Sequence, residues 1–318
     1  MFRLSPIAAA LCGLLLAAPA SAHGVAGAHI FVNTLLIDDP NVADEASLPT
    51  FMWLAQPTDN GVTPTAAVAS IEFSKRITED FGISIGGGYQ WLRTPGQKTR
   101  TGWRNLEATL KYKLFVSAEH EFMLSVGVTR ELARTGASGT NGAALDNDDT
   151  SSTRPTLYWG KGFGDLPIGW ARAFALTGTL GYQMPDRRLK VDPATADPVN
   201  GGGANQWQGG LSLQYSLRYL QAQVKDVGLP DWVNRLTPLV EVAWSSPASR
   251  PNTGSTQYLI GAGVNYTAQT YAITAEALFP GNRQSGSGPG FVVQLHLYFD
   301  DLLPRSLGRP LTQWMAAR

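Results

Sequence analysis

The sequence has one cysteine, few charged residues and no net charge. Cys12 lies near the start of the 318-residue chain, charged residues make up 16% of it, and Lys plus Arg equals Asp plus Glu at 25 each. The rest of the chain therefore contains no disulfide. Nothing in the charge balance favours a strongly charged partner. We predict no nucleic-acid partner and no cofactor.

A long apolar run of the kind that forms a transmembrane helix is also missing. The run from Ile7 to Ala18 is too short, because a spanning helix needs about 20 apolar residues. It follows Arg3 and precedes an Ala-x-Ala cleavage site ending at Ala22. This order is typical of a secretory signal. We predict a signal peptide over residues 1–22, Sec-type export, and a mature chain that begins at His23.

What the mature chain does contain is alternation of apolar and polar residues with a period of two, which predicts strands with one apolar face. From Trp207 to Tyr219, for example, Leu211, Leu213 and Tyr215 share one face and Gln214 lies on the other. About 12 such stretches occur, near residues 49–55, 69–74, 81–91, 105–114, 121–129, 153–163, 174–183, 207–219, 236–245, 257–267, 270–279 and 290–299.

The connections between these stretches mostly alternate between short and long. Thr78 to Asp80 and Ala268 to Gln269 are short, whereas Arg134 to Ser152 and Met184 to Gly203 are long; Gln221 to Arg235 is the exception. Short turns at one end, long loops at the other and aromatic residues at strand ends are typical of transmembrane barrels. A soluble β-sandwich would alternate similarly, but it gives no reason for the alternating connections and would carry more Lys and Glu.

We therefore predict an all-β fold: a transmembrane, antiparallel, up-and-down β-barrel of about 12 strands in the outer membrane of a Gram-negative bacterium. Its predicted parts are a periplasmic arm or lumen plug over 23–48, the barrel over 49–299 and a C-terminal periplasmic tail over 300–318. The predicted partners are outer-membrane lipid and lipopolysaccharide, small-molecule solutes and, during biogenesis, the outer-membrane assembly machinery.

Two segments flanking the predicted barrel carry a family resemblance. Asp38-Asp39-Pro40 to Leu48-Pro49 precedes the first strand, and the last strand runs into Phe299-Asp300-Asp301. This layout resembles outer-membrane transporters associated with meta-pathway phenol degradation, over most of the mature chain but without a diagnostic motif. The resemblance implies a barrel that passes small molecules, including hydrophobic or aromatic compounds, and carries over no functional residue. The tail departs from the usual barrel ending at an aromatic residue.

Polar residues opposite the apolar faces are predicted to line the lumen. The candidates are Glu107, Lys111, Lys113, Glu131, Gln214, Arg218, Glu241, Glu276, Gln294 and His296. Their mixed charges favour a weakly selective polar channel. The same residues could instead pair with one another and fill a narrow barrel. The function predicted is passive passage of small solutes, gated by the outer loops Arg134 to Ser152 and Met184 to Gly203 or by the N-terminal arm.

Two other functions are compatible with the sequence. One is a non-conducting structural or adhesin-like barrel that acts through its outer loops. The other is an outer-membrane lipid hydrolase, which needs a Ser–His pair; His120 follows Ser117 in a predicted turn, and His296 has no clear serine partner. We predict no enzymatic activity and no catalytic residue. His23 and His29 could chelate copper with the N-terminal amine, but we predict no metal site.

Overall fold

The computed structural model describes residues 24–136, 150–194, 199–200, 202–249 and 255–316. The predicted signal peptide and His23 lie outside the described residues. The elements are, in order, β1 (Gly24–Ala26), β2 (His29–Phe31), β3 (Glu45–Ala55), β4 (Thr65–Arg76), β5 (Phe81–Arg93), β6 (Arg100–Trp103), β7 (Leu106–Ser117), β8 (Phe122–Leu132), β9 (Ser152–Gly162), η1 (Gly169–Ala173), β10 (Phe174–Pro185), β11 (Gln206–Tyr215), α2 (Leu217–Tyr219), η2 (Leu220–Val224), α3 (Asp231–Asn234), β12 (Leu236–Pro247), β13 (Gln257–Thr267), β14 (Tyr271–Pro280), β15 (Gly290–Tyr298), α4 (Phe299–Leu302) and α5 (Leu311–Ala316).

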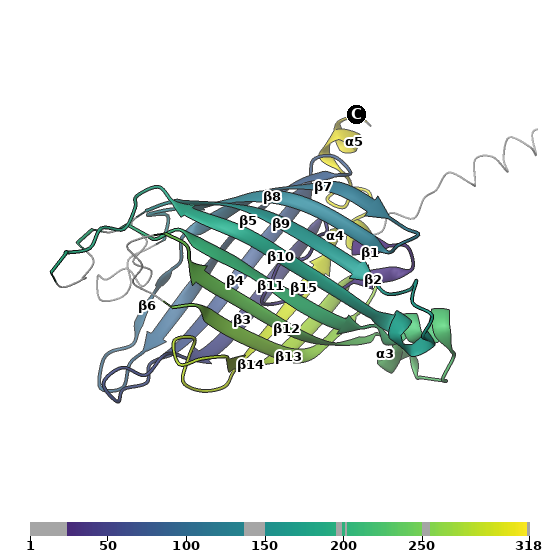
Figure 1. Ribbon diagram of the computed structural model, residues 1–318. Coiled ribbons are helices and arrows are strands. Elements are labelled where there is room, and N and C mark those ends of the chain that lie inside the picture. Colours follow the sequence, from purple (N-terminus) through teal and green to yellow (C-terminus); the bar gives the residue numbers. More distant parts are fainter. Residues whose placement is uncertain (1–23, 137–149, 195–198, 201, 250–254, 317–318) are drawn as a thin grey trace, which may run out of the picture.

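Within these ranges, 12 strands form a closed antiparallel barrel (Figure 1). Strands β3 to β5 and β7 to β15 each pair with the next along the chain, and β15 pairs with β3 to close the sheet; β6 pairs only with the end of β5. The predicted fold class is confirmed. Closure satisfies the backbone groups that an open edge would leave unpaired in hydrocarbon. None of the described helices has the length and apolar character needed to cross a membrane.

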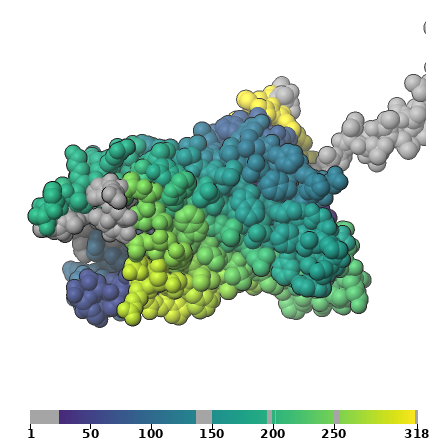
Figure 2. Space-filling model, in the orientation of Figure 1, coloured from purple at the N-terminus to yellow at the C-terminus, as the bar shows by residue number. Residues whose placement is uncertain are grey.

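The distribution of side chains is the reverse of that in a soluble protein. On β14, Ile273 points outward and is 44% exposed, whereas Glu276 points inward and is 3% exposed. Outward apolar residues such as Ile85 and Leu110 are likewise exposed, while inward Gln214 is almost fully buried. An apolar exterior around a polar interior is stable only in lipid, so the period-two pattern in the sequence places its apolar face toward the membrane. On the face seen in Figure 2, the atoms of neighbouring strands pack into a continuous wall.

The two ends of the barrel differ in their connections (Figure 1). The short turns 77–80, 118–121 and 268–270 lie at the end that also holds α2, α3 and the C-terminal helices, and the long loops lie at the other end. In the usual orientation of such barrels the first end is periplasmic, and we call the two ends the periplasmic rim and the outer rim. Exposed tryptophans occur at both rims, Trp103 at the outer and Trp232 at the periplasmic one, as expected of interfacial aromatic girdles.

Several predicted strand boundaries are wrong; the strand predicted near 69–74, for example, begins at Thr65. The first barrel strand begins at Glu45, not at Pro49. The strand predicted to reach Tyr219 ends at Tyr215, because the Ser216 hydroxyl accepts a hydrogen bond from Tyr219 N at 3.1 Å and starts the short helix α2. Arg218 therefore lies on α2, exposed at the periplasmic rim, and does not line the lumen as predicted.

The C-terminal tail folds back onto the periplasmic rim. Arg76 donates from Nε to Asp44 Oδ2 at 3.0 Å and from Nη2 to Asp300 Oδ1 at 2.7 Å. Lys75 Nζ donates to Leu307 O at 2.9 Å. Burial raises the pKa of Asp300 to about 8 despite the neighbouring guanidinium. This buried ion cluster joins the start of β3, the end of β4 and the tail.

Candidate functional site: the lumen and the arm inside it

The segment over residues 24–44, which we call the arm, runs through the interior of the barrel. Its only strands are β1 and β2, so the backbone groups of its irregular part must find other partners. Glu241 Oε2 accepts hydrogen bonds from Leu35 N at 3.2 Å and Leu36 N at 2.7 Å. Gln214 accepts from Val32 N at 3.1 Å and donates to Val32 O at 3.3 Å. Two predicted lumen residues thus bind the arm backbone.

On the opposite wall, Lys111 and Ser125 hold the next turn of the arm. Lys111 Nζ lies 2.7 Å from Asp38 Oδ2, donates to Asp39 O at 3.1 Å and sits 4.6 Å from the centre of the Tyr158 ring. The Ser125 hydroxyl donates to the carbonyl of Pro40. Burial raises the pKa of the Asp39 carboxyl to about 7, with the nearby carboxylate of Glu45 contributing in the same direction.

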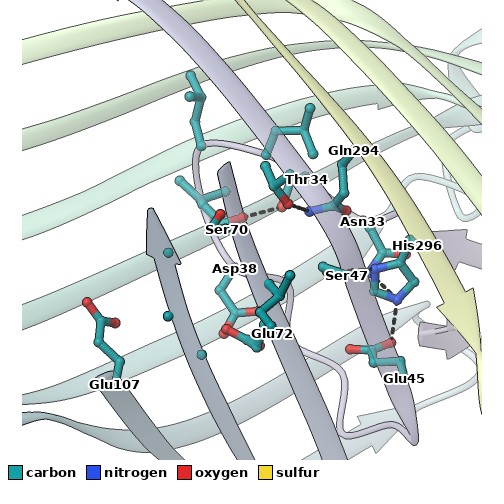
Figure 3. A pocket seen from close by; sticks show the side chains of 18 of the residues that line it. Asn33, Thr34, Asp38, Glu45, Ser47, Ser70, Glu72, Glu107, Gln294 and His296 are labelled. Atoms are coloured by element: carbon teal, nitrogen blue, oxygen red, sulfur yellow. Dashed lines mark hydrogen bonds and ion pairs between the residues drawn. The ribbon is translucent and has the colours of Figure 1, made fainter. Parts of the chain in front are cut away.

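A polar network joins the arm to β3 and β15. His296 Nδ1 lies 3.1 Å from Ser47 Oγ, and its Nε2 lies 3.0 Å from Glu45 Oε2 and 3.3 Å from Asn33 Nδ2 (Figure 3). Tyr298 donates from its hydroxyl to Asn33 Oδ1 at 2.8 Å. His296 does therefore have a serine neighbour, contrary to the sequence-based expectation.

At the periplasmic rim, a histidine anchors the β1–β2 hairpin. His29 Nδ1 lies 3.0 Å from Glu121 Oε2, and Tyr219 donates from its hydroxyl to Glu121 Oε1 at 3.0 Å. The rings of His29 and Tyr219 stack with centres 4.2 Å apart. Burial lowers the pKa of His29, although the Glu121 carboxylate acts in the opposite direction. Gly162 makes the fit possible, because an added Cβ would lie 2.7 Å from the His29 ring.

On the outer side of the arm, three adjoining cavities form a space that we call the outer vestibule. Their volumes are about 330, 510 and 300 Å³. The first two share Glu72, Glu107 and the arm residues Leu36, Ile37 and Asp38; the third also reaches Glu107. The arm therefore forms the floor of a polar vestibule.

The charged side chains that line the outer vestibule are mostly acidic. The carboxylates are Asp38, Asp39, Glu45, Glu72, Glu107 and Glu131, and the guanidinium groups are Arg104 and Arg154. Asp38 is paired with Lys111 and Glu45 with His296, which leaves Asp39, Glu72, Glu107 and Glu131 facing Arg104 and Arg154, so carboxyl groups still outnumber guanidinium groups. Among the described residues, no group of three His, Cys, Asp or Glu side chains is arranged to hold a metal ion.

The remaining predicted lumen residues occupy different levels of the barrel. Glu131 lies near the outer rim and accepts from Asn105 and Ser152. Lys113 lies near the periplasmic rim, with Nζ 3.1 Å from Asp80. Gln294 donates to Thr50 Oγ1 at 2.8 Å from the wall of the first cavity. Glu276 is buried, and neither of its carboxylate oxygens has a hydrogen-bond partner among the described residues.

Several site residues were not among the predicted candidates. Glu72 and Arg154 sit on polar strand faces, so the same alternation that indicated Glu107 could have indicated them. Asn33 and Asp38 belong to the arm, whose irregular sequence carries no periodic signal. The central parts of the two outer loops predicted to act as gates, 137–149 and 195–198, lie outside the described residues.

No family model and no curated protein sequence matches this chain. Among solved structures, an outer membrane channel from Pseudomonas putida F1 superposes with a TM-score of 0.51 at 10% identity, covering 81% of this chain and 96% of that one. The NanC porin gives a TM-score of 0.48 at 8% identity, and the KdgM porin 0.45 at 10%, each covering 79% of this chain and 98% of the porin.

Together, the closed barrel, its apolar exterior and its polar lumen define an outer-membrane β-barrel of porin-like architecture. The likeness to the channel from P. putida supports this fold and nothing finer.

Proposed function

We propose that this protein is an outer-membrane channel for passive passage of small solutes, closed by its own N-terminal arm. Solutes enter the outer vestibule, and release of the arm from the wall opens the path to the periplasm. Hydrophobic or aromatic compounds, the class implied by the family resemblance, are the proposed solutes. The proposal includes Sec-type export, residence among outer-membrane lipid and lipopolysaccharide, and folding by the outer-membrane assembly machinery.

The observation that carries this proposal is how the arm is held. The wall binds it through side chains, chiefly Glu241 to the Leu35 and Leu36 amides, rather than through a continuous strand ladder. Water can replace each of these partners when the arm leaves, so departure of the arm does not disturb the pairing of the barrel strands. A structural filler would have no need for an exchangeable attachment at the floor of an open vestibule.

Planar-bilayer recordings test the proposal. We compare the refolded mature chain with a variant that lacks residues 24–43 and so keeps Asp44, which pairs with Arg76 at the periplasmic rim. Stable conductance steps are expected from the truncated barrel, and fewer or briefer steps from the full chain. Barrel folding is checked for both by the mobility shift between heated and unheated samples. Silence from a correctly folded truncated barrel would contradict the channel function and favour the structural or adhesin-like alternative.

One observation favours a second candidate function, hydrolysis of an ester within the lumen. Ser47, His296 and Glu45 are connected in the order of a nucleophile, a base and an orienting carboxylate, and all three line the first cavity. Serine-directed fluorophosphonate labelling tests it, with Ser47→Ala as the control. Labelling that persists in that variant, or does not occur in the native chain, would exclude this candidate.

A further inference from the structure

We propose that the outer vestibule binds small organic cations, with an ammonium group held between Glu72 and Glu107 and an apolar or aromatic body packed against Leu36 and Ile37 of the arm. This inference rests on the proposed channel function and specifies the solute class for it. An aromatic ring that carries its amine on an aliphatic carbon, as benzylammonium does, combines both requirements, because such an amine is protonated at neutral pH.

The strand register places the two carboxylates on either side of a glycine. Glu72 on β4 is paired with Gly86 on β5, and Gly86 is paired with Glu107 on β7. The three residues form one row across the lumen wall, with the two glutamate Cα atoms two strand spacings, or about 10 Å, apart. Gly86 has no side chain to separate the two glutamates: an added Cβ would lie 3.3 Å from Ile71 O and 3.5 Å from Glu72 Oε2. Figure 3 shows Glu72 and Glu107 on either side of this bare stretch of wall.

The protein neutralises this pair only in part. Glu72 Oε1 is hydrogen-bonded to a hydroxyl, Ser74 Oγ, at 3.4 Å. Arg154 reaches Glu107 only at 3.7 Å from Nη2, while its Nη1 donates to Gln208 at 2.7 Å. The ammonium of Lys111 is engaged by Asp38 and by the Asp39 carbonyl. Excess negative charge therefore faces the cavity.

A second feature of the same cavity independently calls for a hydrogen-bond donor. Gln294 lines it and is only 8% exposed. Its amide nitrogen donates to Thr50, but its carbonyl oxygen is buried and receives no hydrogen bond from the described residues. An unsatisfied buried acceptor is costly. A ligand that donates a hydrogen bond and displaces the groups covering this oxygen would remove that cost.

The surroundings favour an organic cation over a metal ion. The described residues contain no cluster of three metal-binding side chains, and two carboxylates on either side of a glycine suit a group that binds through hydrogen bonds. The adjoining cavity of about 510 Å³ brings Leu36, Ile37 and Leu54 next to this row. An apolar group attached to the ammonium would find its contact surface there.

Calorimetric titration of the folded full chain in detergent tests the proposal with three probes of one shape. Benzylammonium is expected to bind, with benzyl alcohol and benzoate at least about tenfold weaker, because each lacks the charged donor. Glu72→Gln and Glu107→Gln should each raise the Kd for benzylammonium about tenfold, and the double variant more. Glu119→Gln, which removes a carboxyl exposed in the turn 118–121, should leave the Kd unchanged.

Gly86→Val separates a local site from a general attraction to negative charge. It retains every carboxylate but fills the space between the two glutamates, so it should also weaken binding about tenfold or more. Folding of each variant is checked by its mobility on unheated gels.

Equal binding of benzylammonium and benzyl alcohol would overturn the proposal, as would an unchanged Kd in the double variant or in Gly86→Val. If the full chain binds benzylammonium in a charge-dependent way but the truncated barrel does not conduct, the binding site is supported and the channel function is refuted.

Discussion

Replacing Glu241 should release the middle of the arm while leaving its ends bound. Glu241 is fully buried, and its carboxylate accepts from the amides of Leu35 and Leu36. A hydrogen bond to a charged acceptor contributes about 1.5–3 kcal/mol. Loss of both in Glu241→Ala should therefore favour local opening by about 3 kcal/mol at the lower bound, which is roughly a 100-fold change in the opening equilibrium.

Amide hydrogen exchange followed by mass spectrometry measures this opening directly. A peptide covering Leu35 and Leu36 should exchange about 100-fold faster in Glu241→Ala. Glu241→Gln, which retains one acceptor oxygen, should fall between the alanine variant and the native chain. A peptide covering β2 should be unaffected, because Glu121 holds that hairpin separately. Unchanged exchange at Leu35 and Leu36 would refute the view that Glu241 retains the arm; faster exchange throughout the barrel would show general destabilisation instead.

Three further outcomes follow from other contacts of the arm and tail. The folded-state pKa of Asp39, about 7, lies above its ordinary value of 3.8, so docking of the arm should be strongest at low pH and weaken as pH rises through about 7. Asp39→Asn should flatten that pH dependence, measured by amide exchange corrected for its intrinsic dependence on pH. An identical slope in the native and variant chains would contradict this. Gly160→Ala places a Cβ 2.8 Å from the Phe31 ring and should weaken docking of β2 by about 1–3 kcal/mol, which would appear as faster amide exchange in β2. Gly288→Ala, with 3.7 Å of clearance, should have no effect on that exchange. Equal exchange of β2 in the two variants would be inconsistent with tight packing of the Phe31 ring. Asp44→Ala removes a fully buried ion-pair partner and should lower the free energy of unfolding in urea by about 3–5 kcal/mol. Asp44→Asn should lower it by less. An unchanged urea midpoint would mean that the ion cluster at the periplasmic rim contributes no stability.

The barrel could be predicted from the sequence because its two determinants are local. Alternation as clear as that around Leu211 and Leu213 fixes which face meets lipid, and the short and long connections fix the up-and-down order. The end of β11 was missed because alternation continues past the true boundary. The hydrogen bond from Tyr219 N to Ser216 Oγ caps the start of a helix there. The periodicity of apolar residues carries no information about such a helix cap.

The interior was only partly predictable, because its contacts connect residues far apart in sequence. The alternation identified Glu241 and Gln214 as inward-facing, but it gave no sign that Leu36 and Val32 were their partners, some 200 positions away. The mixture of charges suggested weak selectivity; in the folded chain Lys113 lies at the periplasmic rim, whereas the outer vestibule is mainly acidic. Segregation of charge along the barrel axis depends on the register and tilt of the strands, which residue counts do not contain.

The same chemistry allows the lumen to be filled or open without any change in the barrel. A lumen lined by Gln214, Glu241 and Lys111 is stable against water, because every one of these groups can be hydrated. It is equally stable against an irregular segment, because an unpaired backbone needs donors and acceptors of this kind. Neither the filled nor the open state costs the wall much free energy. The equilibrium between the two states therefore depends on a few side-chain hydrogen bonds rather than on the strand ladder. The free energy of these few bonds is comparable to the free energy of binding a solute at Leu36 and Ile37, where the vestibule and the arm share a surface. A solute that binds there can shift the equilibrium of the arm only by as much as its affinity differs between the two states.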